Sequence, residues 1–124
     1  MSGFWYLATP YSLYVSGRHA AFKLAAETRG LLIRAGVAVF SPVVHSHPVA
    51  LYADMDPLDY SIWLPSERPI LDCARGLILL RAPSWELSLG MREERAIFLA
   101  AGKPIVEMDV GVVPDALKGD SNHG

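Results

Sequence analysis

The stretch from Gly76 to Val106 constrains the fold of this 124-residue chain more than any other. It begins with the continuous apolar run GLILL at 76–80, which is typical of a parallel strand buried on both faces of a sheet. Ser88 and Gly90 are residue types that open helices, because a hydroxyl accepts from exposed backbone N–H groups and glycine allows close approach. A Gly-Lys-Pro sequence ending at Pro104 stops that helix before a further apolar strand. The stretch therefore predicts a strand, a helix and a strand of an open α/β sheet, in which ligands bind at the carboxyl ends of the strands.

The N-terminal half predicts the same alternation. Short apolar runs end at prolines, and one segment between them places apolar side chains at helical spacing up to Gly36. A strand, a helix and a strand in so short a span imply a right-handed parallel βαβ unit. The expected strands are 4–8, 37–40, 76–80 and 105–106, and the expected helices are 16–35, 63–74 and a segment between Ser88 and Gly102.

These elements predict an α/β fold of the flavodoxin-like or Rossmann-like type. We expect a three-layer sandwich with a parallel sheet of four to five strands, core order 2-1-3-4, flanked by helices. Residues 1–124 are expected to form one domain with its core at about 4–107 and a frayed tail at 119–124. Residues 41–62 contain three prolines and no regular periodicity, and so predict a long functional loop.

Composition and charge exclude several classes of protein. Hydrophobic content of 52% with 19% charged residues excludes a disordered chain. A net charge of −2 without a basic block argues against a nucleic-acid polymer as partner. The single cysteine fits a reducing compartment, and no apolar stretch reaches the roughly 18 residues of a membrane span. The start of the chain has no signal-peptide pattern, so we expect a cytoplasmic protein without a membrane partner.

Three motifs in order carry a resemblance to a known family. The run Trp85-x-x-Ser88-x-Gly90-x-x-x-Glu94-x-Ala96, with Gly102-Lys103-Pro104 after it, resembles the signature of the nucleoside 2-deoxyribosyltransferase-like superfamily. Within it, the chain is most similar to a group of short bacterial and phage-type proteins. These share the Tyr-Leu-Ala-x-Pro-Tyr opening at 6–11 and the Ser-Pro-x-x-His-Ser-His segment at 41–47. The matches span about residues 4–107.

The resemblance implies an N-glycosidic enzyme that acts on a nucleoside or a nucleoside 5′-monophosphate. Such an enzyme is a hydrolase or a transferase, according to whether water or a second base accepts the sugar. The resemblance also implies a homo-oligomer, a dimer or a tetramer, and no metal or organic cofactor. An alternative is a non-catalytic nucleotide-binding or sensing domain that retains the pocket.

Glu94 matches the glutamate that the resembling family uses as its nucleophile. Retaining glycosyl transfer needs a carboxylate that attacks the anomeric carbon and holds the sugar covalently. With an ordinary pKa of about 4.3, a glutamate is expected to be ionised at neutral pH. The alternative is that Glu94 belongs to a solvated charged face together with its neighbours at 92–95. Tyr6 resembles a family tyrosine that orients the nucleophile, with a plain core aromatic as the alternative and Tyr11 as another provider.

The general acid that protonates the leaving base is normally a carboxyl group with a raised pKa. The resembling family places an aspartate on the helix before the strand of the Ser-x-Gly turn. In this chain that helix offers Glu67 and Asp72, with Asp59 just upstream, and the spacing does not decide among them.

The remaining candidates are expected to contact the substrate. Ser88 and Gly90 open a helix whose free N–H groups attract a phosphate, although a hydroxyl there is also an ordinary helix cap. Trp85 and Trp63 stack on a base or simply pack. Two histidines without a third ligand at fixed spacing do not predict a metal site. The predicted substrate-binding residues are Ser88, Gly90, Trp85, Tyr11, His45, His47, Asp59 and Trp63.

Overall fold

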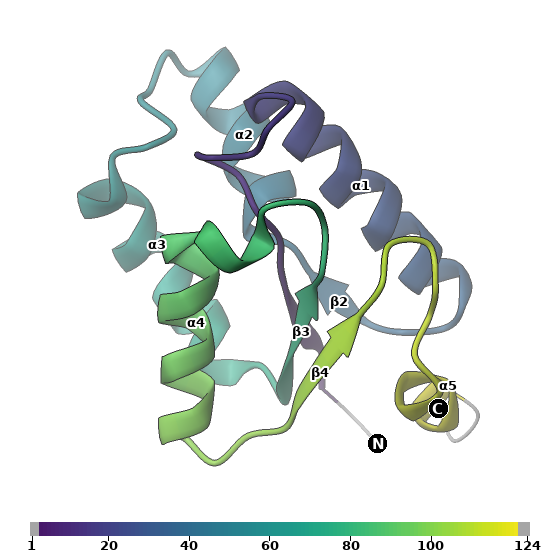
Figure 1. Cartoon of the computed structure of the whole chain (residues 1–124). Coiled ribbons are helices and arrows are strands. Elements are labelled where there is room, and N and C mark those ends of the chain that lie inside the picture. The colour runs from purple at the N-terminus through teal and green to yellow at the C-terminus, as the bar shows by residue number, and fades with distance from the viewer. Residues whose placement is uncertain (1–2, 122–124) are drawn as a thin grey trace.

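The computed structural model describes the backbone of residues 3–121 and the side chains of residues 3–118. It contains a four-stranded parallel sheet with the order β2-β1-β3-β4, flanked by helices on both faces (Figure 1). The predicted three-layer α/β architecture and the order 2-1-3-4 are therefore confirmed. The strands are β1 Trp5–Ala8, β2 Val39–Phe40, β3 Gly76–Leu80 and β4 Ile105–Met108; the helices are α1 Arg18–Arg34, α2 Pro42–Tyr52, α3 Tyr60–Cys73, the 3-10 turn η1 Trp85–Leu87, α4 Leu89–Ala100 and α5 Asp115–Ser121.

The central strands are buried on both faces because successive side chains alternate between two hydrophobic layers. On one face, Leu7 packs in a cluster with Leu32 of α1 and with a side chain of α5. On the other face, Tyr6 packs with Phe98 of α4 and with side chains of α3. Each fully buried side chain of this size contributes about 1.5–3 kcal/mol through the hydrophobic effect. The continuous apolar runs in the sequence thus reflect burial on two sides.

Gly76 at the start of β3 fixes how the strands meet. A Cβ atom at this position would lie 2.4 Å from the Trp5 ring and 2.8 Å from the carbonyl oxygen of Pro104, so no larger residue fits. Gly76 pairs with Trp5, and the next residue pairs with Ile105. This close contact sets the register of the three strands and brings their carboxyl ends to one edge of the sheet.

Helix α2 corrects the prediction of a long loop at 41–62. Ser41 caps the helix by accepting a hydrogen bond from the N–H of Val44 at 3.2 Å, and Pro42 occupies its first turn, where proline is favoured. Pro48 lies inside the helix and removes one backbone hydrogen bond. The segment is apolar on most sides, so it has no helical periodicity in its sequence. Its prolines therefore predicted a break where the chain continues as a helix.

Helix α3 begins three residues before its predicted start at residue 63. Asp59 caps it by accepting from the N–H of Ser61 at 3.2 Å, so Pro65 lies in its interior and not in its first turn. At its other end, Lys103 Nζ donates to the carbonyl oxygens of Asp72 at 2.6 Å and Ala74 at 2.7 Å. A cation stabilises these free carbonyl groups at a helix C-terminus. The Gly-Lys-Pro sequence therefore anchors α3 to the entry of β4.

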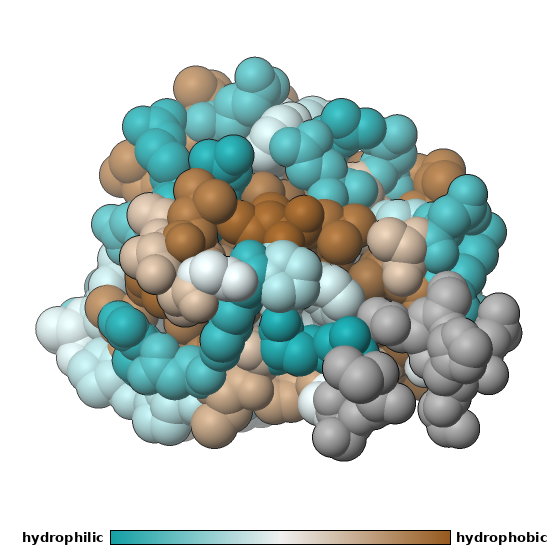
Figure 2. Space-filling model, turned by 90° about the horizontal axis from the view of Figure 1, so that it is seen from below, coloured by the Kyte–Doolittle hydropathy of each residue, from teal (hydrophilic) through white to brown (hydrophobic). Residues whose placement is uncertain are grey.

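Two outer features complete the fold. Helix α5 extends to Ser121, so residues 119–121 are helical where a frayed tail was predicted, and residues 122–124 lie outside the described range. Figure 2 shows the edge of the molecule where the strands begin, with a band of apolar side chains bordered by polar ones. None of the helices described is long and apolar enough to cross a lipid bilayer.

Candidate active site

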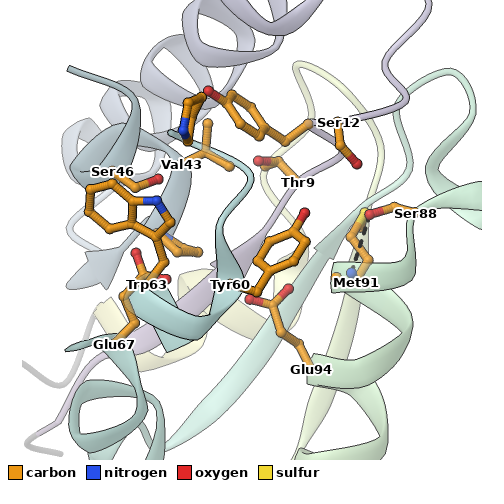
Figure 3. A pocket seen from close by; sticks show the side chains of 14 residues that line it. Thr9, Ser12, Val43, Ser46, Tyr60, Trp63, Glu67, Ser88, Met91 and Glu94 are labelled. Atoms are coloured by element: carbon orange, nitrogen blue, oxygen red, sulfur yellow. Dashed lines mark hydrogen bonds between the residues drawn. The ribbon is translucent and has the colours of Figure 1, made fainter. Parts of the chain in front are cut away.

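The candidate site lies at the carboxyl ends of β1 and β3, where the order 2-1-3-4 makes the chain leave the sheet in opposite directions. Such a switch point is where open α/β sheets bind ligands. Five segments line the cavity there: the loop after β1, the start of α2, the loop between α2 and α3, the first half of α3 and the start of α4 (Figure 3). In Figure 3 the side chains of Thr9, Tyr60 and Glu94 point toward the same space.

Glu94 lies on the second turn of α4 and faces the sheet, while the adjacent Glu93 is exposed. The pKa of Glu94 is raised to about 8: burial is the largest cause and the nearby charge of Glu67 adds to it, whereas a hydrogen bond with Tyr6 acts in the opposite direction. The expectation that Glu94 is ionised at neutral pH is therefore wrong for the ligand-free pocket. Its carboxyl group lines the cavity, so the solvated charged face proposed as the alternative does not describe it.

Glu67 extends from α3 into the same cavity. Its residue is only 9% exposed, and its Oε2 atom has no hydrogen-bond partner among the described residues. Burial raises the pKa of Glu67 to about 7. The charge of Glu67 acts on Glu94, so the two carboxyl groups titrate as a pair that carries about one proton in total between pH 7 and pH 8.

Two adjacent cavities meet at these carboxyl groups. The first, of about 80 Å³, carries the hydroxyl groups of Thr9, Ser12, Ser46, Tyr60 and Ser88, and we call it the hydroxyl-lined cavity. The second, of about 210 Å³, is walled by Leu64, Leu71, Leu89 and Ile97, and we call it the leucine-lined cavity. Both are lined by Tyr60, Glu67, Gly90 and Glu94. The acids therefore lie on the wall shared by a cavity that has hydroxyl groups among its apolar side chains and a larger, more apolar cavity.

Tyr6 of β1 reaches the site from the sheet. It is 1% exposed, lines the leucine-lined cavity, and its hydroxyl is hydrogen-bonded to Glu94. Burial raises the pKa of the Tyr6 hydroxyl, and the negative charges of Glu94 and Glu67 raise it further. The hydroxyl thus stays protonated and serves as a donor to the carboxylate, while the ring also packs in the core against Phe40 and Phe98.

Ser88 and Gly90 are both brought to the site. The Oγ of Ser88 accepts from the N–H of Met91 at 3.2 Å, so it is a helix cap and also lines the cavity. A Cβ atom added to Gly90 would meet only this Oγ, at 4.0 Å, so the space in front of the helix start is open. The first turn of α4, where a helix leaves N–H groups without a partner in the helix, therefore borders an open space at Gly90.

Of the predicted aromatic contacts, Trp63 and Tyr11 line the hydroxyl-lined cavity. Trp63 is buried, and its indole Nε1 donates to the carbonyl oxygen of Asp56 at 2.9 Å. The hydroxyl of Tyr11 is hydrogen-bonded to Nδ1 of His47 at 2.6 Å. Trp85 lies on η1 and packs beside the core cluster of α3 and α4, away from both cavities at the acids.

Four other predicted residues do not line the two cavities at the acids. Asp72 is exposed on α3 and pairs with Arg68 at 2.8 Å, so it does not reach the space that Glu67 occupies. Asp59 caps the start of α3. His45 is exposed on α2, and His47 stacks on Phe22 in a neighbouring open cavity.

Sequence reasoning missed four hydroxyl groups that the fold brings into the cavity, those of Thr9, Ser12, Ser46 and Tyr60. Thr9 directly follows β1, which is the position where loop residues reach a ligand in this class of sheet. That signal was present in the sequence. Ser46 and Tyr60 could not be found in the same way, because they lie within a predicted structureless segment that forms α2 and the start of α3.

Fold and site together define a small α/β domain with paired, desolvated carboxyl groups at the carboxyl ends of a parallel sheet. The chain matches the family model described as "Domain of unknown function (DUF1937)" over residues 3–110, and it belongs to that family. No significant match to a curated protein is found.

Proposed function

We propose that this protein is an N-glycosidic enzyme that acts on a nucleoside or a nucleoside 5′-monophosphate, by hydrolysis or by base transfer. The observation that carries the proposal is the position of Glu67 and Glu94 on the wall shared by the two cavities. A nucleoside joins a hydroxyl-bearing sugar to a flat, largely apolar base through one C–N bond. With the sugar in the hydroxyl-lined cavity and the base in the leucine-lined cavity, that bond lies beside both acids. The motif resemblance to nucleoside 2-deoxyribosyltransferase-like proteins supports the same chemistry.

In the first step, the ionised carboxylate of Glu94 attacks the anomeric carbon. The C–N bond breaks, its electron pair goes to the base nitrogen, and the proton held by Glu67 neutralises the departing base. The products are a free base, a glycosyl ester on Glu94 and an ionised Glu67. In the ligand-free pocket the remaining proton lies mainly on Glu94, because its pKa is the higher of the two. The reactive form is the less populated one, in which that proton has moved to Glu67 and Glu94 is ionised.

In the second step, water or a second base attacks the same carbon. Ionised Glu67 takes the proton of the attacking group, the ester bond breaks, and the carboxylate of Glu94 is restored. Two displacements at one carbon retain the anomeric configuration. The hydrogen bond from Tyr6 favours negative charge on Glu94 in both steps, so Tyr6 orients the nucleophile and supports its ionisation.

The start of α4 is the proposed site for a 5′-phosphate. A helix of this length presents free N–H groups and a partial positive charge at its N-terminus. Gly90 leaves room in front of it, and Ser88 lines the hydroxyl-lined cavity where the sugar is proposed to lie. The phosphate and the glycosidic bond would then be held by two turns of one helix.

The test is release of free base from a panel of nucleosides and nucleoside 5′-monophosphates, followed by chromatography. We expect release by the unmodified protein, a loss of more than about a thousandfold in Glu94→Gln, and little change in Glu27→Gln. Glu27→Gln is the matched control, because its side chain is exposed on α1 and lines neither cavity. Binding of these ligands without base release would instead favour a nucleotide-binding or sensing domain.

We further propose that the protein is a homo-oligomer in which a neighbouring subunit covers the leucine-lined cavity. Leu64, Leu89 and Tyr60 on its rim are 44%, 60% and 53% exposed. Exposed apolar groups of this kind around a pocket are typical of an interaction surface. Light scattering after size exclusion is expected to give a dimer or a tetramer, and Leu89→Glu is expected to shift it toward the monomer.

A further inference from the structure

Two side-chain atoms of the hydroxyl-lined cavity are buried without a hydrogen-bond partner within the part of the chain that the structure describes. They are Oε2 of Glu67 and Oγ1 of Thr9. Proton donation to the leaving base gives Glu67 a partner in the proposed reaction. Thr9 has no role in that reaction, although its residue is only 5% exposed.

A buried hydroxyl without a partner is destabilising. Leaving such a group unpaired costs about 1–3 kcal/mol. Valine has the same shape as threonine without the hydroxyl, and it is favoured beside a buried strand such as β1. Packing therefore does not explain a threonine here, whereas a ligand that supplies a hydrogen bond does.

The position of Thr9 indicates which part of a ligand it meets. Thr9 lines the hydroxyl-lined cavity and not the leucine-lined cavity, so it lies on the side assigned to the sugar. In Figure 3 its hydroxyl points into the space that Glu94 faces from α4. The groups that a sugar ring presents in such a position are its own hydroxyls, and a threonine hydroxyl both donates to and accepts from them.

We propose that Thr9 is a specificity-determining residue that binds the 2′- or 3′-hydroxyl of the substrate sugar. The inference rests on the proposed function and narrows its substrate class to nucleosides that carry this ring hydroxyl. A site built to bind a hydroxyl rejects the analogue that lacks it, because its own polar group is then left unpaired. In this role Thr9 discriminates between sugars by its hydrogen bond and takes no part in breaking the glycosidic bond.

The experiment compares kcat/KM for a ribonucleoside, its 2′-deoxy analogue and its 3′-deoxy analogue with the same base. In the unmodified protein, one deoxy analogue is expected to be poorer than the ribonucleoside by about tenfold or more. Thr9→Val is expected to remove this discrimination, while its kcat/KM for that deoxy analogue stays within about twofold of the value of the unmodified protein. Thr9→Ser keeps a hydroxyl and is expected to keep the preference. Thr28→Val is the matched control, a buried threonine on α1 that lines neither cavity.

The outcomes separate this inference from the proposed function. If base is released and Thr9→Val discriminates between the ribonucleoside and its deoxy analogues as strongly as the unmodified protein does, the proposed role of Thr9 is wrong. The proposal that the protein is an enzyme is then unaffected. If no nucleoside releases base, the same three compounds are compared by equilibrium binding. Loss of the binding preference in Thr9→Val then supports the inference while the enzyme assignment fails, and equal binding or none overturns both. Circular dichroism of each variant verifies that the fold is intact.

Discussion

The hydroxyl of Tyr6 on β1 is hydrogen-bonded to the carboxyl group of Glu94 on α4, across the buried face of the sheet. Burial raises the pKa of both groups, so the tyrosine stays protonated and the glutamate holds its proton more tightly than it would in water. The tyrosine donates toward the carboxylate, and this contact lowers the pKa of Glu94 against the effect of burial. The ionisation of the proposed nucleophile therefore depends on a strand residue in the core.

Tyr6→Phe tests that dependence, because it removes the hydroxyl and retains the packed ring. We expect the pKa of Glu94 to rise, so the acidic limb of the profile of kcat/KM against pH moves to higher pH. At neutral pH the rate of base release should fall by about ten to a hundred times. Tyr14→Phe, which changes a tyrosine outside both cavities, is the control. If the acidic limb is unchanged in Tyr6→Phe, the hydroxyl of Tyr6 does not control the ionisation of Glu94.

The paired acids predict a bell-shaped dependence of kcat/KM on pH. The singly protonated pair is the active form, and the two pKa values of about 7 and about 8 place the maximum between them. Glu67→Gln removes the group that must stay protonated, so the alkaline limb should disappear.

The same variant tests whether Glu67 protonates the leaving base. Glu67→Gln should slow release of a natural base by about a hundredfold or more, and slow release of an activated aryl leaving group much less. An activated group needs no proton to depart. Equal losses for both kinds of leaving group would contradict the role of Glu67 as acid.

Stability should fall with rising pH because of Glu94. Its pKa is about 8 in the fold against 4.5 in the unfolded chain, so the folded protein binds more protons between these values and loses stability as pH increases through them. Glu94→Gln does not titrate. The free energy of unfolding in urea should therefore rise in Glu94→Gln relative to the unmodified protein, by more than about 1 kcal/mol between pH 5 and pH 8.5. Glu27→Gln, at an exposed position on α1 outside both cavities, should show no such gain.

Lys103 is predicted to stabilise α3 without taking part in chemistry. Its ammonium group donates to the carbonyl oxygens of Asp72 and Ala74 at the end of that helix. Lys103→Met should lower the free energy of unfolding by about 1–2 kcal/mol, because both carbonyl groups lose a charged donor. Lys23→Met, an exposed lysine on α1, should change it by less than about 0.5 kcal/mol. Equal effects in a denaturant titration would show that the contact contributes nothing.

The sheet could be predicted because its buried strands require a recognisable pattern of apolar residues in the sequence. Burial on both faces requires continuous apolar runs such as 76–80, and strand-helix-strand spacing then fixes a parallel order. Helix α2 was missed although Ser41-Pro42 is a typical helix start, because an apolar helix with an internal proline shows no helical periodicity in its sequence. The raised pKa of Glu94 was missed for a related reason. It depends on how deeply the fold desolvates that side chain, and spacing does not report this.

The choice between Glu67 and Asp72 also needed the fold. They lie five residues apart on α3, so they point to different faces of the helix. Glu67 is one turn before the buried Leu71 and shares its face, whereas Asp72 is one turn after Arg68 and shares the exposed face. Sequence spacing allowed both, because it does not say which face packs on the sheet.

The most direct measurement is the mass of the protein during turnover of a nucleoside whose sugar carries fluorine at the 2′ position. Fluorine slows the second step, so the glycosyl ester should accumulate. We expect the mass of the quenched protein to increase by one sugar residue, peptide mapping to place that sugar on Glu94, and Glu94→Gln to remain unmodified. Release of base from the same compound with no change in protein mass, or a sugar bound to another side chain, would contradict Glu94 as the nucleophile.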